Sequence, residues 1–322
     1  MNNSTISANF TTGKRKVAII GVGYVGASIA YTLTVRNIAR EIVLIDKDIQ
    51  RAQGEASDIR HGVPFMGTSF VYAGDYADCA DCDLIIICAG RNRRSGETRR
   101  DLVDSNVDIM KNVIAFLKPY YTHGTILVVA NPVDILTQVA SDLMQLPNGR
   151  VFGSGCILDT SRLTACIADY LSLSTDAVKA IVVGEHGDEQ TPVWSRVAIA
   201  GVPIDEYCEA VGLPWGDTQR QTLHEKVRSM GASIIRNKGK THYGIATCVC
   251  YLADAVLNQR QIIAPVSSPL IGEYGVKGVS LSVPSIVGVN GVERRLEERW
   301  SEKEYAQFLT AADRLRECLE SL

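Results

Sequence analysis

The side chain best suited to proton transfer in this sequence is His186, which lies between two glycines in the run VGEHGD at residues 183–188. Histidine titrates close to neutral pH, so it can both donate and accept a proton. Glycine neighbours let the backbone approach a ligand closely. By itself the run also fits a surface turn with an incidental histidine. The pair Asp159 and Arg162, three residues apart upstream, favours a reacting site instead.

A second chemical signature is the pattern G-x-G-x-x-G formed by Gly21, Gly23 and Gly26. It follows an apolar run and precedes a helical stretch. In a dinucleotide-binding loop the first glycine permits the turn, the second lets a pyrophosphate approach, and the third lets helix and strand pack closely. Asp46 ends the next apolar run, where a carboxylate accepts a hydrogen bond from a ribose 2′-hydroxyl and repels a 2′-phosphate. The sequence therefore predicts a site for NAD rather than NADP.

The elements that position these groups alternate in the first half of the chain between short apolar runs and longer amphipathic stretches. Strands that alternate with helices indicate a parallel sheet covered on both faces, a doubly wound (Rossmann) α/β fold. The expected strands are at 16–20, 41–45, 69–72, 83–88 and 125–130, and the expected helices at 24–36, 49–60 and 99–117.

The pattern changes near residue 153, after which longer helical stretches and fewer strands follow. We expect helices at 159–171, 218–238, 241–258 and 301–320, with short strands at 179–183 and 278–283. The predicted organisation is a flexible N-terminal tail at 1–15, an NAD-binding Rossmann domain at 16–153 and an α+β substrate or catalytic domain at 154–322.

Ligands of doubly wound sheets bind at the carboxyl ends of the strands. Gly90 and Asn131 follow the fourth and fifth expected strands, and Ser154 would follow a sixth strand. All three are therefore candidates to line the cofactor groove. Val25, Tyr76 and Val129 complete the set of expected cofactor-binding residues.

Composition excludes several classes of partner. The chain has 322 residues and a formal net charge of −3, so no electrostatic attraction to nucleic acid or to a membrane surface is expected. No apolar run approaches the roughly 20 residues of a membrane span. Residues 1–12 lack the charged start and apolar stretch of a secretory signal, which favours the cytoplasm.

The nine cysteines are irregularly spaced, and no four of them form the regular ligand pattern of a structural zinc site. We therefore expect no metal, and thiols that stay reduced inside a reducing compartment.

With these motifs in order, the chain resembles the L-lactate/malate dehydrogenase family over about residues 16–290. The resemblance implies an NAD-dependent dehydrogenase of 2-hydroxy acids that forms a homodimer or homotetramer. The matching stretches are GVGYVG at 21–26, AG at 89–90, GETR at 96–99, NPVD at 131–134, LDTSR at 158–162, GEHGD at 184–188 and YGIA at 243–246.

The resemblance also implies a role for each reacting residue. His186 would exchange a proton with the substrate, and Asp159 would hydrogen-bond its imidazole. Arg162 would grip the substrate carboxylate with two parallel hydrogen bonds. Arg99 would polarise the carbonyl oxygen, and Asn131 would bind both cofactor and substrate. The loop at 90–98 would close over the site and exclude water.

The identity of the hydroxy acid depends on Arg93, six residues before Arg99. Members that act on malate typically carry arginine there, where it pairs with the second carboxylate of oxaloacetate, and members that act on lactate carry glutamine. A buried guanidinium also requires an anion, which oxaloacetate supplies and pyruvate does not. Thr241, a substrate-binding candidate, matches the lactate branch instead. We expect a malate dehydrogenase, with a lactate dehydrogenase as the alternative.

A more remote alternative is a nucleotide-sensing protein that kept the fold and lost catalysis. Such a protein would be expected to lack His186, Arg99 or Arg162, and all three are present.

Overall fold

The computed structural model describes residues 15–92 and 98–322, so residues 1–14 of the tail expected at 1–15 lie outside the described residues. Parallel strands pair in the spatial order β3-β2-β1-β4-β5-β6. This is the 3-2-1-4-5-6 order of a doubly wound dinucleotide-binding sheet. The strands are β1 (Lys16–Ile20), β2 (Glu41–Ile45), β3 (Phe70–Ala73), β4 (Leu84–Ile87), β5 (Thr125–Val128) and β6 (Val151–Gly153).

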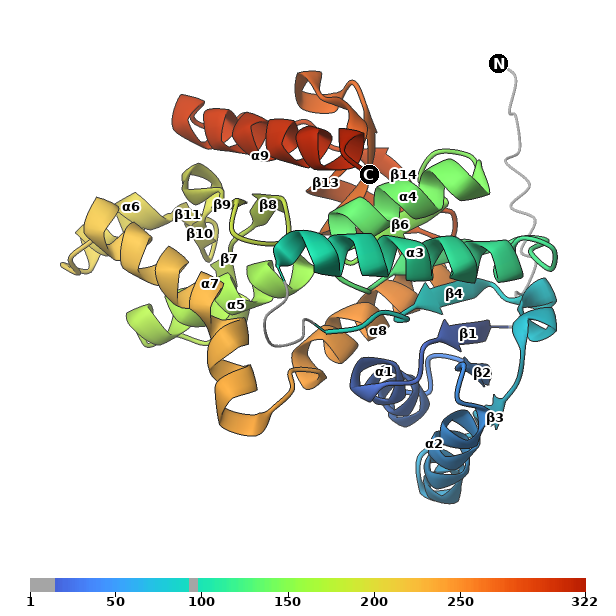
Figure 1. The fold of residues 1–322 in the computed structure, drawn as a ribbon. Coiled ribbons are helices and arrows are strands. Elements are labelled where there is room, and N and C mark those ends of the chain that lie inside the picture. The colour runs from blue at the N-terminus through green and yellow to red at the C-terminus, as the bar shows by residue number, and fades with distance from the viewer. Residues whose placement is uncertain (1–14, 93–97) are drawn as a thin grey trace, which may run out of the picture.

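Helices cover both faces of this sheet because successive strand residues point to opposite sides. In β1, Val17 and Ile19 pack in one core and Ala18 and Ile20 in the other. The first core is closed by α1 (Tyr24–Val35), α2 (Ile49–Gly62) and α8 (Tyr243–Leu257), and the second by α3 (Arg99–Leu117), α4 (Val133–Met144) and α9 (Glu302–Glu320). Figure 1 shows α3 and α4 side by side across the sheet.

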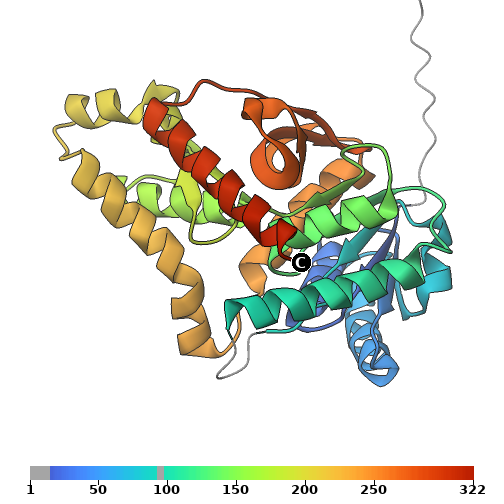
Figure 2. The ribbon, with the colours of Figure 1, turned by 45° about the horizontal axis from the view of Figure 1, so that its top comes forward.

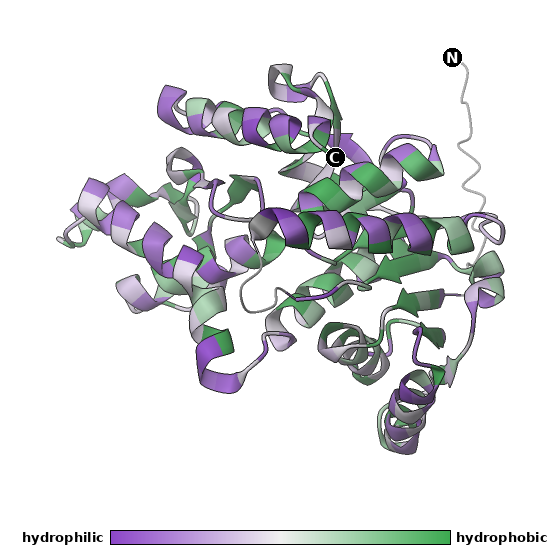
Figure 3. Cartoon of the chain, viewed as in Figure 1, coloured by the Kyte–Doolittle hydropathy of each residue, from purple (hydrophilic) through white to green (hydrophobic). Residues whose placement is uncertain are grey.

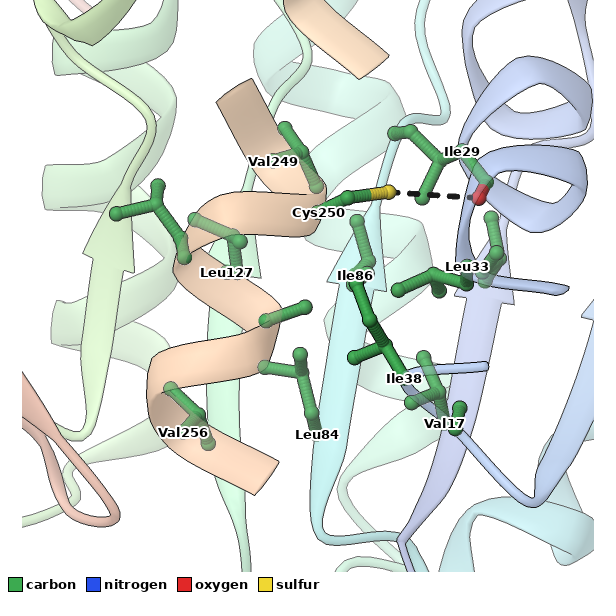
Figure 4. Close-up of a cluster of buried hydrophobic side chains, with 14 of the residues drawn as sticks. Val17, Ile29, Leu33, Ile38, Leu84, Ile86, Leu127, Val249, Cys250 and Val256 are labelled. Carbon is green, nitrogen blue, oxygen red and sulfur yellow. Dashed lines mark hydrogen bonds between the residues drawn. The ribbon is translucent and has the colours of Figure 1, made fainter. Parts of the chain in front are cut away.

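Helix α8 joins the two halves of the chain in one core. Figure 4 shows Val249, Cys250 and Val256 of α8 packed against Leu84 and Ile86 of β4. The thiol of Cys250 also donates a hydrogen bond to the carbonyl of Ile29 in α1, at 3.6 Å. The segment that follows Thr241 is therefore held against the helix that follows the glycine loop.

The sheet does not end at the expected boundary near residue 153. Gly153 of β6 pairs antiparallel with Ser267, and further antiparallel strands extend the same sheet. The doubly wound prediction is confirmed for the parallel part, but the whole sheet is mixed. The strand expected at 278–283 lies within one arm of a long antiparallel hairpin, and the other arm, at 262–271, was not predicted. These strands are β12 (Ile262–Ile271), β13 (Lys277–Gly288), β14 (Gly291–Arg295), β8 (Val182–Gly184) and β9 (Gln190–Pro192).

A third core lies between α5 and α7, and Figure 2 shows these helices away from the parallel strands. The strand expected at 179–183 is divided between the small sheet of this region and the large sheet. The elements here are α5 (Ile157–Leu171), α6 (Ile204–Ala210), α7 (Asp217–Lys238), β7 (Val178–Lys179), β10 (Ala198–Ile199) and β11 (Val202–Pro203). Short 3₁₀ helices occupy Val63–Phe65, Tyr76–Asp81, Thr175–Ala177, Trp194–Arg196 and Glu273–Gly275.

The hydropathy of the elements follows this layering. Figure 3 shows hydrophobic strands at the centre and helices such as α7 and α9 that carry hydrophilic residues along their exposed sides. Within the described ranges, no helix combines the length and apolar character needed to cross a membrane.

Candidate active site

The three glycines of the loop after β1 differ in the space available for a side chain. Gly21 has φ +92°, and a Cβ built there would lie 2.5 Å from the backbone nitrogen of Ala89. A Cβ on Gly26 would lie 2.1 Å from the carbonyl oxygen of Gly21, where α1 packs on the loop. A Cβ on Gly23 would meet nothing within 4 Å. The loop is thus closed where helix and strand meet and open at Gly23, which fits the approach of a dinucleotide pyrophosphate to the helix N-terminus.

Asp46, at the end of β2, lies directly beside this loop. Its Oδ2 accepts a hydrogen bond from the backbone N–H of Val22 at 2.6 Å, and its Oδ1 accepts one from Asp48 at 3.0 Å. The carboxylate therefore connects the glycine loop to β2 through a hydrogen bond. It also lies where we expect the ribose hydroxyl of a dinucleotide to bind. This expectation rests on the predicted position of the cofactor.

Tyr76 and Val25 occupy flanking positions. Tyr76 begins the 3₁₀ helix Tyr76–Asp81 and its ring lies 5.6 Å from that of Phe116. Burial raises the pKa of Tyr76, and the nearby charge of Asp46 adds to this shift. Val25, in the first turn of α1, packs against the core on the α8 side of the sheet.

Four of the expected groove residues lie at the carboxyl ends of β4, β5 and β6: Gly90, Val129, Asn131 and Ser154. The backbone N–H of Ser154 donates to the carbonyl of Val128 at 2.9 Å, which keeps the end of β6 beside the end of β5. The Asn131–Pro132 peptide bond is cis.

Sequence reasoning missed Asn106, the side chain that joins two of these strand ends. It is 1% exposed on α3, its Nδ2 donates to the carbonyls of Arg91 and Asn131 at 3.1 and 2.7 Å, and its Oδ1 accepts from the N–H of Arg91 at 2.9 Å. The only signal in the sequence is an amide on the apolar face of a helix. Asn106 therefore fixes the backbone at Asn131 to the segment after β4.

His186 and Asp159 form the reacting pair at the other side of the groove. Nδ1 of His186, in the loop between β8 and β9, lies 2.5 Å from Oδ2 of Asp159 in α5. Asp159 is 1% exposed. Burial opposes its ionisation, but the charges of His186 and Arg162 and their hydrogen bonds hold the pKa of Asp159 below its usual range.

The pKa of His186 shifts in the opposite direction. Burial by itself lowers it, whereas the charge and hydrogen bond of Asp159 and the charge of Asp134 raise it, so that the pKa reaches about 8. The imidazole is thus cationic at neutral pH and loses its proton just above it, which suits a group that both donates and accepts a proton. Because Nδ1 is engaged, Nε2 is the nitrogen left for a substrate.

Arg162 lies one helical turn after Asp159. Its Nη1 is 3.3 Å from Oδ1 of Asp159, and its side chain is 14% exposed. The other guanidinium edge remains available for a planar anion such as a carboxylate. Thr241 is half-buried just before α8, close to the link that His242 makes from its Nδ1 to the hydroxyl of Ser28 at 2.8 Å.

A cavity of about 630 Å³ opens next to the imidazole. Asn131 and His186 both line it, which brings the cofactor-side and reacting-side predictions together. Arg100 at the start of α3 and Arg314 of α9 lie on its walls. Its size suits a small organic acid together with part of a larger ligand.

Arg93 lies outside the described residues, and so does most of the loop expected to close over the site. Arg99 is the first residue of α3, whose N-cap is Thr98. The described residues contain no group of three or more His, Cys, Asp or Glu side chains arranged to hold a metal ion. The cysteines are present as free thiols.

Comparison with known proteins covers almost the whole described chain. Residues 15–153 match the lactate/malate dehydrogenase NAD binding domain, and residues 156–322 match the lactate/malate dehydrogenase alpha/beta C-terminal domain. The first match thus assigns NAD binding to the whole of residues 15–153, in agreement with the prediction made from the glycine loop.

Individual relatives also match nearly all of the chain. The L-lactate dehydrogenase of Acetivibrio thermocellus is 41% identical over 96% of this chain and 97% of its own length, and that of Priestia megaterium is 41% identical over 97% and 98%. The solved structure of a minor L-lactate dehydrogenase from Enterococcus mundtii, in a ligands-bound form, has a TM-score of 0.93 at 36% identity and covers 96% of this chain and 99% of its own.

Proposed function

We propose, given that the chain belongs to the lactate/malate dehydrogenase family, that this NAD-dependent 2-hydroxy acid dehydrogenase interconverts L-lactate and pyruvate. The observation that carries the reaction type is the His186–Asp159 pair with Arg162 beside Asp159. Of these residues, His186 lines a cavity that Asn131 also lines. The choice of substrate is supported by the relatives, because those compared above carry the name L-lactate dehydrogenase.

The chain's own residues divide the work of reducing a 2-oxo acid. Arg162 binds the carboxylate and orients the substrate. His186, as the imidazolium, donates the proton on Nε2 to the carbonyl oxygen, and buried Asp159 stabilises the cation before that transfer. Bound NADH supplies the hydride that the carbonyl carbon receives. One hydride and one proton thus convert the 2-oxo acid to the 2-hydroxy acid, and oxidation of the hydroxy acid runs the same transfers in reverse.

Asn131 and Arg99 complete the proposed site. Asn131 lies on the cavity wall, at the end of β5 where the cofactor groove and the reacting side meet. Arg99 heads α3 and is assigned the role of polarising the carbonyl oxygen during hydride transfer. Both assignments rest on the family motif at these positions.

Oxaloacetate and L-malate remain a second candidate pair because of one residue. Arg93 places an additional guanidinium six residues before Arg99, where it would pair with a second carboxylate. The relatives oppose our first expectation of a malate dehydrogenase, and Thr241 also matches the lactate branch. Arg93 is the single observation in favour of the dicarboxylate.

Steady-state reduction of pyruvate and of oxaloacetate with NADH separates the two candidates. The proposal expects a higher kcat/KM for pyruvate. A higher kcat/KM for oxaloacetate would replace it with the malate assignment, and no NADH oxidation with either acid would remove the enzymatic proposal altogether. Phenylpyruvate, a bulky monocarboxylate, serves as a control for general tolerance of the pocket.

The domain boundary and the assembly are part of the same proposal. We place the boundary near residue 153, in keeping with the two family matches at 15–153 and 156–322. The family resemblance favours a homodimer or homotetramer, which light scattering after size-exclusion chromatography would test directly.

A further inference from the structure

A second carboxylate, Asp134, contacts the backbone of His186, whereas Asp159 contacts its ring. Its Oδ2 accepts a hydrogen bond from the backbone N–H of His186 at 2.7 Å, across 52 residues of sequence. Asp134 is 3% exposed. It lies in the first turn of α4, three residues after Asn131. One side chain therefore connects the Asn131 segment with the loop that carries the proton donor.

Burial of this carboxylate is unfavourable unless it is paired and hydrogen-bonded, because a buried ionised group loses its hydration. Burial raises the pKa of Asp134 to about 6, although the Ser267 hydroxyl and the N–H of His186 favour the ionised form. The N-terminus of α4 favours negative charge as well. Between about pH 6 and pH 8 the side chain is thus a buried anion beside a cationic histidine.

We propose that Asp134 is a positioning residue for His186, which anchors the histidine backbone at the cavity and whose negative charge favours the imidazolium form. Asp159 holds the ring through Nδ1, and Asp134 holds the main chain of the same residue. The inference rests on the acid–base role proposed above for His186. It adds a residue to which the sequence motif alone assigned no function.

Other charged groups around His186 do not duplicate this arrangement. Asp159 and Arg162 approach from α5, Arg100 from α3, and Glu185 and Asp188 from the loop itself. Beyond them, Glu189 of the loop pairs with Arg314 of α9. Cys156 stays neutral because burial raises the pKa of its thiol well above the usual value. Asp134 is the buried anion on the α4 side of the imidazole.

The substitution D134N separates charge from anchoring, because the amide oxygen of asparagine can still accept the His186 N–H. We expect the rate of 2-oxo acid reduction to reach the wild-type plateau at acid pH and to begin its alkaline fall about one pH unit lower, since a nearby opposite charge shifts a pKa by about that much. The KM for NADH should stay unchanged. D134A, which removes the acceptor too, should also lower the plateau by about tenfold.

The matched control is D142N, an equal change of charge on the same helix. Asp142 is exposed, and its carboxylate accepts a hydrogen bond from Gln138 rather than from the His186 loop. Its alkaline limb should coincide with that of wild type. A D134N limb that also coincides with wild type would overturn the proposal, as would an equal shift in D142N.

A spectroscopic titration keeps the test independent of substrate and of the folding of the Asp134 variants. In the wild-type protein, the His186 ring resonances, assigned by their loss in H186A, should titrate near pH 8 with a smaller inflection near pH 6, where Asp134 loses its proton. A single inflection would overturn the charge coupling. If H186A instead kept full turnover, the proposed reaction would fail, which is a different outcome from a missing Asp134 effect.

Discussion

Nδ1 of His186 lies 2.5 Å from Oδ2 of Asp159, although the two residues are 27 positions apart and belong to a loop and a helix. The contact joins a side chain that is 23% exposed at a cavity to one that is 2% exposed behind it. A partly exposed histidine paired with a buried carboxylate is suited to hold a proton on Nε2. The buried carboxylate stabilises the imidazolium, and its burial keeps water from taking the place of the ring at this contact.

Replacement of His186 by alanine tests this relationship most directly. The variant should bind NADH as wild type does and lose turnover by a factor on the order of 10² to 10⁴, the usual contribution of a general acid or base. Fluorescence titration gives the affinity for NADH and a stopped-flow assay gives the turnover. H123A is the matched control, because the side chain of His123 is 54% exposed and lies near Asp83, away from the cavity. Retention of more than half the turnover in H186A would contradict the assignment.

The pH dependence of the two directions should be opposite in sign. Reduction of the 2-oxo acid requires the imidazolium, so its kcat/KM should be constant below and fall above the pKa of His186, which is about 8. Oxidation of the hydroxy acid requires the neutral ring, so its kcat/KM should rise over the same interval. In D159N the main contribution that raises this pKa is removed, and both limbs should move to lower pH. Limbs that stay at pH 8 in D159N would show that Asp159 does not control the proton.

Much of this site could be predicted from the sequence because its signals are local. The glycine loop, the strand before it and the acid that ends β2 are neighbours in sequence, and the structure places them as expected. Strand β12 was missed because Pro265 and Pro269 lack the N–H groups of a central strand, yet both are accommodated in its antiparallel pairing with β13. Asp134 and Asn106 were missed because their partners lie on other elements, and no periodicity shows which N–H or carbonyl a side chain will meet.

Two glycine substitutions should have opposite effects on stability. In G26A the new methyl group would lie 2.1 Å from the carbonyl of Gly21, so the loop must shift. We expect a loss of about 1–3 kcal/mol in the free energy of unfolding, as for other overpacked sites, together with a higher KM for NADH. G54A is the control, because Gly54 lies in α2 with open space around it. There alanine should stabilise the protein by about 0.5–1 kcal/mol. Denaturant titration measures both, and equal effects would contradict the packing role of Gly26.

Cofactor preference should depend on the charge of Asp46. Wild type should use NADH with a higher kcat/KM than NADPH, because the carboxylate accepts from a ribose hydroxyl and repels a phosphate. D46N should narrow this ratio while it preserves the hydrogen bond from the N–H of Val22, since the amide oxygen can accept it. D58N, an exposed change of charge on α2, should leave the ratio unchanged. Equal use of both cofactors by wild type would show that Asp46 serves only to hold the glycine loop.

The last prediction concerns Arg93, whose effect distinguishes the two candidate substrates. If a guanidinium faces the substrate inside a closed site, oxaloacetate gains a partner and pyruvate leaves a charge unpaired. R93Q would then lower kcat/KM for oxaloacetate, because it removes the partner of the second carboxylate. It would also raise kcat/KM for pyruvate, because it removes the unpaired charge, so both effects shift the ratio of the two efficiencies toward pyruvate. Breaking a buried charge pair costs about 3–5 kcal/mol, or roughly two to four decades in efficiency.

If wild type prefers pyruvate, as the proposed function expects, Arg93 should have no charged partner on the substrate. R93Q should then change the ratio of the two efficiencies less than about threefold, as for other exposed charges. Salt then gives a second criterion, because about 0.5 M NaCl screens a solvated arginine and has little effect on a buried pair. R36Q is the control, an exposed change of the same kind at the end of α1. A large, salt-resistant change in R93Q alone would assign the dicarboxylate to this site.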